Sequence, residues 1–270
     1  MRRTTVLALM TTGIMFAGAA CGQSGSPQSQ PSRDQGPQRN VIVDATEYSY
    51  AMPEEVTGGA VTFELSNTGQ QPHEFAFVRL DEGKTVEDLM SAFKQRRQPK
   101  WAHDLAGVGV LSAQSTAAMS RELEEGSYAF FCFLPSPDGQ PHIAHGMIQG
   151  FEVTGTSDAK LPTPDAVVTA TDEGFEVPDI SAGTHAVEFR NEGTKPHEFA
   201  VVSFEPGKGE RDLGRWFNRG YEGDAPALFP GGIQAIAPGS SVIMELEFVS
   251  GRTYTFEDFE NRLSAEITIP

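Results

Sequence analysis

The chain has 270 residues, of which 39% are hydrophobic, and this length allows one large domain or two of about 110–120 residues each. Its 28 glycines and 18 prolines favour many turns, and therefore a β-rich fold over a bundle of helices. The formal net charge of −17 argues against nucleic acid and anionic lipid surfaces as partners. It suits a basic protein partner, or solubility alone.

The first twenty residues resemble an export signal. Arg2 and Arg3 precede "VLALMTTGIMFAGAA", an apolar run too short to span a bilayer permanently. Cys21 follows, and "GAAC" resembles the lipobox of bacterial lipoproteins, in which the cysteine is diacylated and becomes the new N-terminus. Gly18 departs from the leucine usual in that motif, and ordinary cleavage after "AGA" is the alternative. We expect an exported protein with a lipid anchor at Cys21, facing the periplasm or the cell exterior.

Residues 21–39 are predicted to form a disordered tether. The segment "GQSGSPQSQPSRDQGPQR" is polar, rich in Pro, Gly, Ser and Gln, and has no apolar periodicity. Such a segment has an r.m.s. reach of about 20–25 Å, which would lift a folded domain off a membrane surface.

The remainder of the chain contains an internal repeat. "NTGQQPHEFAFV" (67–78) returns as "NEGTKPHEFAVV" (191–202), and the pattern of 108–130 returns in the same order at 231–256. We therefore predict two tandem domains, residues 40–155 and 165–270, joined by a Pro/Thr/Asp-rich linker at 156–164.

Each copy predicts short strands and one helix. "VTFELSN" (61–67) and "HAVEFRN" (185–191) alternate apolar and polar residues and end in Asn-x-Gly turns. "KTVEDLMSAFKQ" (84–95) has an apolar helical face behind Thr85 as N-cap, and "ERDLGRWFN" (210–218) is its counterpart. The expected fold is all-β: two tandem Greek-key β-sandwiches, each with one short inserted helix.

Cys132 is the residue that most needs an explanation. It has no internal disulfide partner, because the other cysteine is the proposed lipid anchor. One explanation is a buried core thiol among neighbouring phenylalanines. The other is a metal site, because His142 and Met147 follow in a C-x9-H-x4-M pattern and His73 lies in a separate loop. Two histidines, one cysteine and a weak methionine are the ligand set of blue-copper electron-transfer sites.

These motifs resemble the cupredoxins. "Y-x-F-x-C" before a loop, "P-H-x4-M" within that loop and "P-H-E-F" on an earlier strand occur in the order of the family's ligands. The resemblance implies one type 1 copper, held by His73, Cys132, His142 and Met147. His145 is the alternative to His142, and the sequence favours His142 by its spacing to Met147.

Two features depart from the family, and two further histidines have no supporting context. The Cys-to-His loop is longer than in plastocyanin-like members, and Glu74 stands where many cupredoxins have Asn or Ser. His103 and His185 are expected to be structural or solvated.

The second copy lacks most of the ligands. His197 keeps the "PHEF" context, but Asp258 takes the place of Cys132 and no methionine follows it. We expect no copper in residues 165–270.

The expected function is single-electron transfer by a membrane-anchored copper protein. Catalysis is not expected, because no His-x-His pair exists to hold a second copper centre and phenylalanines flank Cys132. Copper handling without electron transfer, or a metal-free binding module, are the alternatives. The expected partners are a redox protein, which a basic surface would suit, and the membrane through the lipid anchor. No small-molecule substrate is evident.

Overall fold

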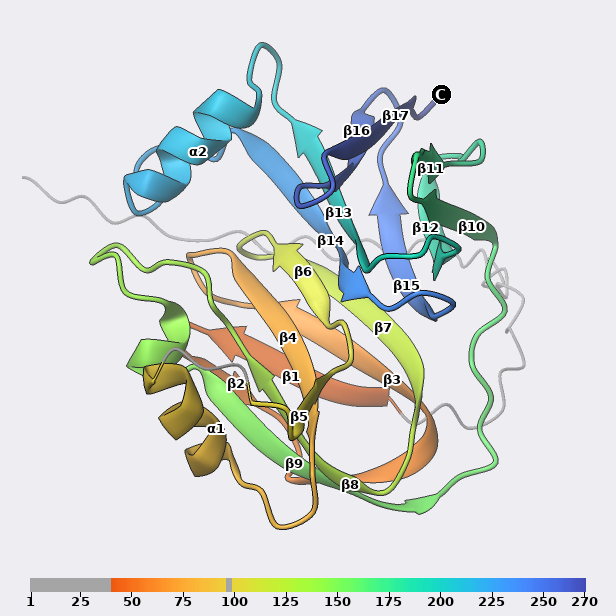
Figure 1. Cartoon of the computed structure of the whole chain (residues 1–270). Coiled ribbons are helices and arrows are strands. Elements are labelled where there is room, and N and C mark those ends of the chain that lie inside the picture. The colour runs from red at the N-terminus through yellow and green to blue at the C-terminus, as the bar shows by residue number, and fades with distance from the viewer. Residues whose placement is uncertain (1–39, 96–98) are drawn as a thin grey trace, which may run out of the picture. The chain divides into compact units, whose positions relative to one another are not determined.

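The computed structural model describes residues 40–95 and 99–270, which lie within one compact unit of the chain (Figure 1). The predicted signal segment, Cys21 and the tether lie outside the described residues. In the described part, no helix is both long enough and apolar enough to span a bilayer.

The predicted all-β fold, with one helix in each half, is confirmed. We call the elements β1 to β9 the first half and β10 to β17 the second half. The first half contains β1 (Asn40–Thr46), β2 (Ser49–Ala51), β3 (Glu55–Asn67), β4 (His73–Leu80), α1 (Val86–Lys94), β5 (Ala102–Asp104), β6 (Val108–Leu111), β7 (Thr116–Leu123), β8 (Gly126–Phe131), the 3-10 turn η1 (His142–His145) and β9 (Ile148–Thr156).

The second half repeats this order without counterparts of β5 and η1. It contains β10 (Ala166–Thr171), β11 (Gly174–Glu176), β12 (Gly183–Asn191), β13 (His197–Phe204), α2 (Glu210–Asn218), β14 (Ala227–Ile236), β15 (Ser241–Phe248), β16 (Thr253–Asp258) and β17 (Leu263–Thr268).

The strand pairing is duplicated as the repeat predicts. In the first half β1 is parallel to β3, β3 is antiparallel to β7, and β4 is antiparallel to β6 and β8. In the second half β10 is parallel to β12, β12 is antiparallel to β15, and β13 is antiparallel to β14 and β16. Sequence similarity and pairing therefore mark the same internal duplication.

Strand pairs also cross from one half to the other. β7 is antiparallel to β15, and β6 is antiparallel to β14. One layer therefore runs from β2 through β1, β3 and β7 to β15, β12, β10 and β11. The other runs from β9 through β8, β4 and β6 to β14, β13, β16 and β17. The two halves thus share both layers. Strand pairing joins them, in addition to the chain itself.

One strand joins the two layers of the first half. Residues 59–66 of β3 pair with β7, whereas residues 55–58 pair with β9. Gly59 has φ of +89°, and a Cβ on Gly58 would lie 2.6 Å from the carbonyl oxygen of Gly155. Glycine is required where a strand turns this sharply against a neighbouring backbone.

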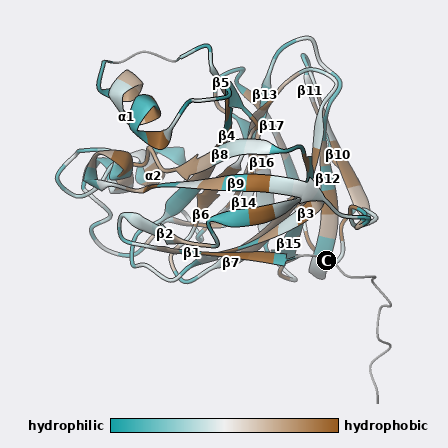
Figure 2. Ribbon diagram, turned by 90° about the horizontal axis from the view of Figure 1, so that it is seen from below, coloured by the Kyte–Doolittle hydropathy of each residue, from teal (hydrophilic) through white to brown (hydrophobic). Residues whose placement is uncertain are grey.

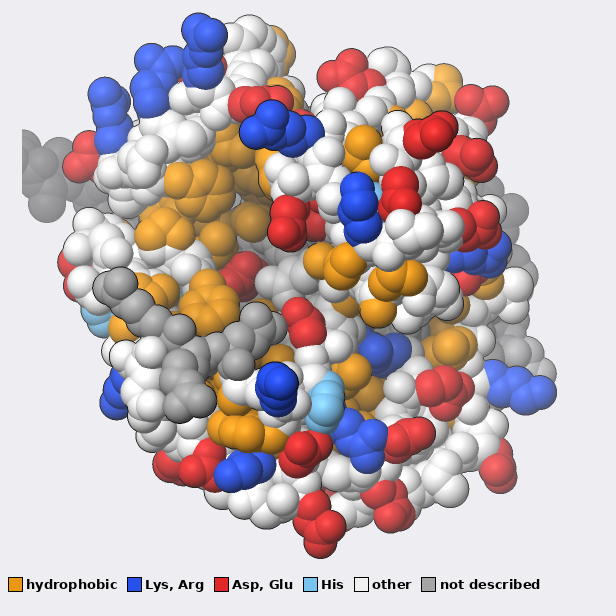
Figure 3. Space-filling model, in the orientation of Figure 1, with side chains coloured by type: hydrophobic (Ala, Val, Ile, Leu, Met, Phe, Trp, Pro, Cys, Tyr) orange, Lys and Arg blue, Asp and Glu red, His pale blue; other side chains and the backbone are white. Residues whose placement is uncertain are grey.

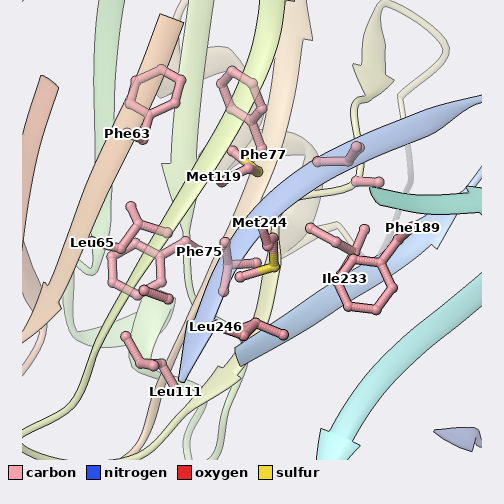
Figure 4. Close-up of a cluster of buried hydrophobic side chains, with 14 of the residues drawn as sticks. Phe63, Leu65, Phe75, Phe77, Leu111, Met119, Phe189, Ile233, Met244 and Leu246 are labelled. Atoms are coloured by element: carbon pink, nitrogen blue, oxygen red, sulfur yellow. The ribbon is translucent and has the colours of Figure 1, made fainter. Parts of the chain in front are cut away.

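The buried core is continuous between the halves. One cluster includes Phe63 and Phe75 of the first half together with Ile233 and Met244 of the second (Figure 4). Hydrophobic residues alternate with polar ones along many strands, whereas the loops are mostly hydrophilic (Figure 2). Fully burying one such side chain contributes about 1.5–3 kcal/mol to folding.

The helix α1 begins as predicted. Thr85 is its N-cap, and the Thr85 side chain accepts the backbone N–H of Asp88 at 3.2 Å. Leu89 of α1 packs with Phe131 of β8 in a second cluster, on the opposite face of the β4–β8 layer from the main core.

Candidate metal centre

The predicted ligands meet at one end of the β4–β8 layer. His73 is the first residue of β4, and Cys132 follows the last residue of β8. β4 and β8 are antiparallel with Ala76 opposite Phe131, so the start of one strand lies beside the end of the other. Two positions that are far apart in the sequence therefore become neighbours.

Backbone hydrogen bonds fold the loop after Cys132 back onto it. The N–H of Ile143 donates to the carbonyl of Cys132 at 2.8 Å, and the N–H of Cys132 donates to the carbonyl of Met147 at 3.3 Å. The N–H of Met147 donates to the carbonyl of His142 at 3.1 Å. This short ladder brings both His142 and Met147 to the thiol.

Three donor atoms then converge in a buried space. The Nδ1 atoms of His73 and His142 are 3.1 Å apart, and the Sγ of Cys132 is 3.4 Å from the Nδ1 of His142. All the donor atoms of this group lie within 4.8 Å of one another, and each of the three side chains is fully buried. Met147 is also fully buried and belongs to the same core cluster as Cys132.

The protonation chemistry of these groups suits a metal ion. Burial lowers the pKa of both His73 and His142 to about 4. The neighbouring His142 lowers the pKa of His73 further, and His145 has the same effect on His142. Both rings are therefore neutral at pH 7 and have a free lone pair. Burial raises the pKa of Cys132, and the charge of Glu74 raises it further, so a metal must displace the thiol proton.

The hydrogen bonding of the two histidine rings also suits a metal ion. Two neutral Nδ1 atoms facing each other can share one proton at most, and the Nε2 atoms of His73 and His142 are buried with no partner among the described residues. An ion that accepts a lone pair from each Nδ1 and from sulfur would separate the facing nitrogens and leave the single proton of each ring on its Nε2. Thiolate favours soft metal ions and imidazole suits several transition metals, among them copper. Together they form the donor set of a copper site.

His145 lies away from this cluster. Its Nε2 is 3.0 Å from the Oγ of Ser136 and 3.2 Å from the carboxylate of Asp138, and its ring stacks on Tyr48 at 4.5 Å. Of the two histidines that the sequence left open, the structure places His142 beside the thiol.

Glu74 connects the cysteine to the second half. Its N–H lies 3.5 Å from the Sγ of Cys132, and its carboxylate accepts the backbone N–H of Phe133. The other carboxylate oxygen accepts the side-chain amide of Gln234 at 3.2 Å. Burial raises the pKa of Glu74. The departure noted in the sequence therefore has a structural role, because this side chain ties the loop after Cys132 to β14.

The repeated Asn-x-Gly turn positions the first histidine. The side chain of Asn67 donates to the carbonyls of Gln71 and Leu111 at 2.9 and 3.1 Å and accepts the N–H of Gly69 at 3.0 Å. Asn191 makes the same three kinds of bond in the second half. The sequence showed this asparagine as part of a turn, and its effect is to hold the loop that delivers His73.

Sequence reasoning missed the tyrosines around His142. The Tyr48 ring is 5.1 Å from the His142 ring, and the Tyr221 ring is 6.5 Å from it. The hydroxyl of Tyr221 donates to the carbonyl of Pro135, in the loop between Cys132 and His142. A Cβ on Gly220 would lie 2.6 Å from the backbone of Pro137, so the contact between the two halves is close here. No local sequence pattern predicts this contact, because it joins two loops that are distant in sequence.

In the second half, two carboxylates hold the equivalent histidine, and Asp258 stands in the place of Cys132. The Nδ1 of His197 lies 2.7 Å from Asp258, and its Nε2 lies 3.1 Å from Asp172. The N–H of Glu198 donates to Asp258 at 3.3 Å, as the N–H of Glu74 approaches Cys132. His197 is thus held by hydrogen bonds where His73 faces a thiol and a second imidazole.

No protein-family model and no curated protein matches the chain. Among solved structures, an auracyanin from the photosynthetic bacterium Roseiflexus castenholzii is 20% identical and covers 44% of this chain and 99% of its own, with a TM-score of 0.32. A multicopper oxidase is 13% identical over 86% of this chain and 88% of its own, with a TM-score of 0.26. A copper nitrite reductase from Nitrosomonas europaea is 16% identical over 87% of this chain and 94% of its own, also with a TM-score of 0.26.

These matches correct the expectation that the chain is not an enzyme. The oxidase and the nitrite reductase are enzymes, and their matches cover most of this chain. The expectation was wrong because it rested on the absence of a His-x-His pair and on the phenylalanines beside Cys132, whereas one fold serves both carriers and enzymes. The likeness concerns the fold alone.

Proposed function

We propose that the chain is a type 1 copper protein that transfers single electrons, with His73, Cys132, His142 and Met147 as ligands. The observation that carries this proposal is the buried convergence of two imidazole nitrogens and one thiol from three separate segments. Two neutral Nδ1 atoms that face each other can form at most one hydrogen bond, whereas an ion could accept a lone pair from both nitrogens and from the sulfur.

Each residue of the centre has a distinct part in this proposal. His73 and His142 offer neutral nitrogens, Cys132 offers a thiolate once its proton has left, and Met147 offers a weak thioether. Bound copper would supply the reversible uptake of one electron. The N–H of Glu74 stabilises negative charge on the sulfur.

The surroundings of the centre exclude water. The fully buried Phe75 and Phe130 belong to the same core cluster as Cys132, and Tyr221 adds a wall from the second half beside His142. A dry shell disfavours the more highly charged oxidised centre and therefore raises the reduction potential.

The proposal is tested by adding Cu(II) to the purified chain and recording visible and electron paramagnetic resonance spectra. We expect an intense blue thiolate-to-copper band, narrow copper hyperfine splitting and one copper per chain. Ascorbate should bleach the band, and ferricyanide should restore it with one electron per copper. Weak, ordinary Cu(II) signals, or a band that does not return, would contradict single-electron cycling.

The same titration addresses the domain organisation. We propose that residues 40–155 hold the copper, that 156–164 are a linker and that 165–270 bind none, because Asp258 and Asp172 already engage His197. A second tightly bound copper that survives Cys132→Ser would overturn the last of these statements.

We also propose that the protein is exported and lipid-anchored through Cys21, on the strength of the "GAAC" segment. Mass spectrometry of the mature N-terminal peptide from detergent-extracted protein should show acyl groups on Cys21. A peptide that begins elsewhere, or an unmodified Cys21, would exclude the anchor. The acidic surface suits a basic redox partner, whose association should weaken as salt is added.

A further inference from the structure

A cavity of about 550 Å³ lies on the outer face of the β4–β8 layer, bordered by β5, α1 and the β13–β14 edge of the second half. This volume is within the range of small-molecule sites. Figure 3 shows hydrophobic side chains gathered in a hollow on this face, with acidic side chains beside them. The cavity is separate from the donor cluster, because none of His73, Cys132, His142 and Met147 lines it.

Three aromatic rings form the apolar wall of the cavity. Phe93, Phe131 and Phe133 lie edge to face, with ring centroids 5.1–5.3 Å apart. Phe133 is 46% exposed, although it is a large hydrophobic residue. An aromatic molecule in the cavity would cover this ring and pack against the other two in the same geometry.

The polar border of the cavity is acidic. Asp104 and Glu198 both line it, from opposite halves of the chain. Burial raises the pKa of both carboxyls, and at Glu198 nearby Asp258 contributes to a pKa of about 7. The acidic residues Asp258, Glu74 and Glu257 act on Glu198, whereas the cationic Arg121 acts on Asp104. A cation near Glu198 would relieve this repulsion, whereas an anion would add to it.

The cavity lies on the opposite face of the extended segment that carries Cys132. Phe131 and Phe133 flank Cys132, and alternation along an extended segment directs their rings to the face opposite the thiol. Gln234, which also lines the cavity, donates to Glu74. An occupant would therefore contact residues directly bonded to Cys132 without touching the donor atoms.

We propose that this cavity binds a small aromatic molecule that carries an amine, with its ring against Phe93, Phe131 and Phe133 and its ammonium group toward Glu198 and Asp104. The site depends on the packing of the two halves and is independent of copper. A test of this site is therefore independent of the test of the electron-transfer function.

Calorimetry on the metal-free full chain at pH 8 tests the site, with tryptamine as the probe and indole-3-acetate as the matched anion. We expect saturable binding of tryptamine and at least about tenfold weaker binding of indole-3-acetate, since the two share a ring and differ in charge. Equal binding of both, or no saturable binding of tryptamine, would overturn the proposal.

Two variants locate the binding within the cavity. Glu198→Gln keeps the shape of the side chain and should weaken tryptamine about tenfold, because it removes the charge facing the ammonium group. Phe133→Ser should weaken both probes, because it removes part of the wall. Glu247→Gln, at an exposed glutamate on β15, is the control and should change nothing. If Glu198→Gln binds tryptamine as the unmodified chain does, with circular dichroism showing both folded, the site is not the one proposed.

Discussion

Replacing Cys132 with serine is expected to abolish the blue thiolate-to-copper band while leaving the fold intact. The band requires a sulfur orbital that donates charge to the metal, and a serine hydroxyl offers neither that orbital nor an accessible anion at neutral pH. Any remaining Cu(II) should give weak, ordinary spectra. Cys132 is fully buried and its substitution by serine changes the side-chain volume little, so circular dichroism should show the same β-rich protein.

Two histidine variants sharpen this result. His142→Ala should remove the blue band as Cys132→Ser does, because the Nδ1 of His142 lies beside both His73 and Cys132. His145→Ala should keep the band, because the His145 ring is bonded to Ser136 and Asp138 instead. Retention of the band in His142→Ala together with its loss in His145→Ala would reverse the assignment of the ligand.

The second large effect is expected on stability, in the second half. Asp258→Ala should lower the free energy of unfolding by about 2–4 kcal/mol, because it leaves the buried Nδ1 of His197 and the other donors to this carboxylate without an acceptor. The side chains of His197 and Asp258 are both fully buried at 2.7 Å. Asp258 also accepts hydrogen bonds from Asn261 and from the N–H of Glu198, and these donors would lose their acceptor.

Urea unfolding of the metal-free protein measures this effect against a matched control. Asp165→Ala removes another aspartate that faces a histidine in the same half, but the pair to His185 is 3.8 Å long and Asp165 is 45% exposed. Its cost should be about 1 kcal/mol or less. If Asp258→Ala costs no more than Asp165→Ala, the His197 cluster does not stabilise the second half. Because the halves share two sheets, coincident transitions by fluorescence and circular dichroism should accompany the measurement.

The candidate donors could be chosen from the sequence because each carries a local signal. "PHEF" occurs twice, and the C-x9-H-x4-M pattern follows a strand that is rich in aromatic residues. The choice between His142 and His145 was harder, because both belong to one four-residue turn. It depends on backbone bonds from His142 to Leu134 and from Ile143 to Cys132, which are set by the folded loop.

The sequence by itself determined the internal duplication, the β-rich class, the helix that Thr85 caps and the donor types of the candidate site. All of these rest on periodicity, turn residues or short motifs, which act over a few neighbouring positions. Only the tertiary structure decided how the halves meet. The pairing of β6 with β14 and of β7 with β15, the bond from Tyr221 to Pro135 and the amide of Gln234 on Glu74 all join residues far apart in the chain. Such contacts follow from the packing of two surfaces, and packing leaves no regular spacing in a sequence.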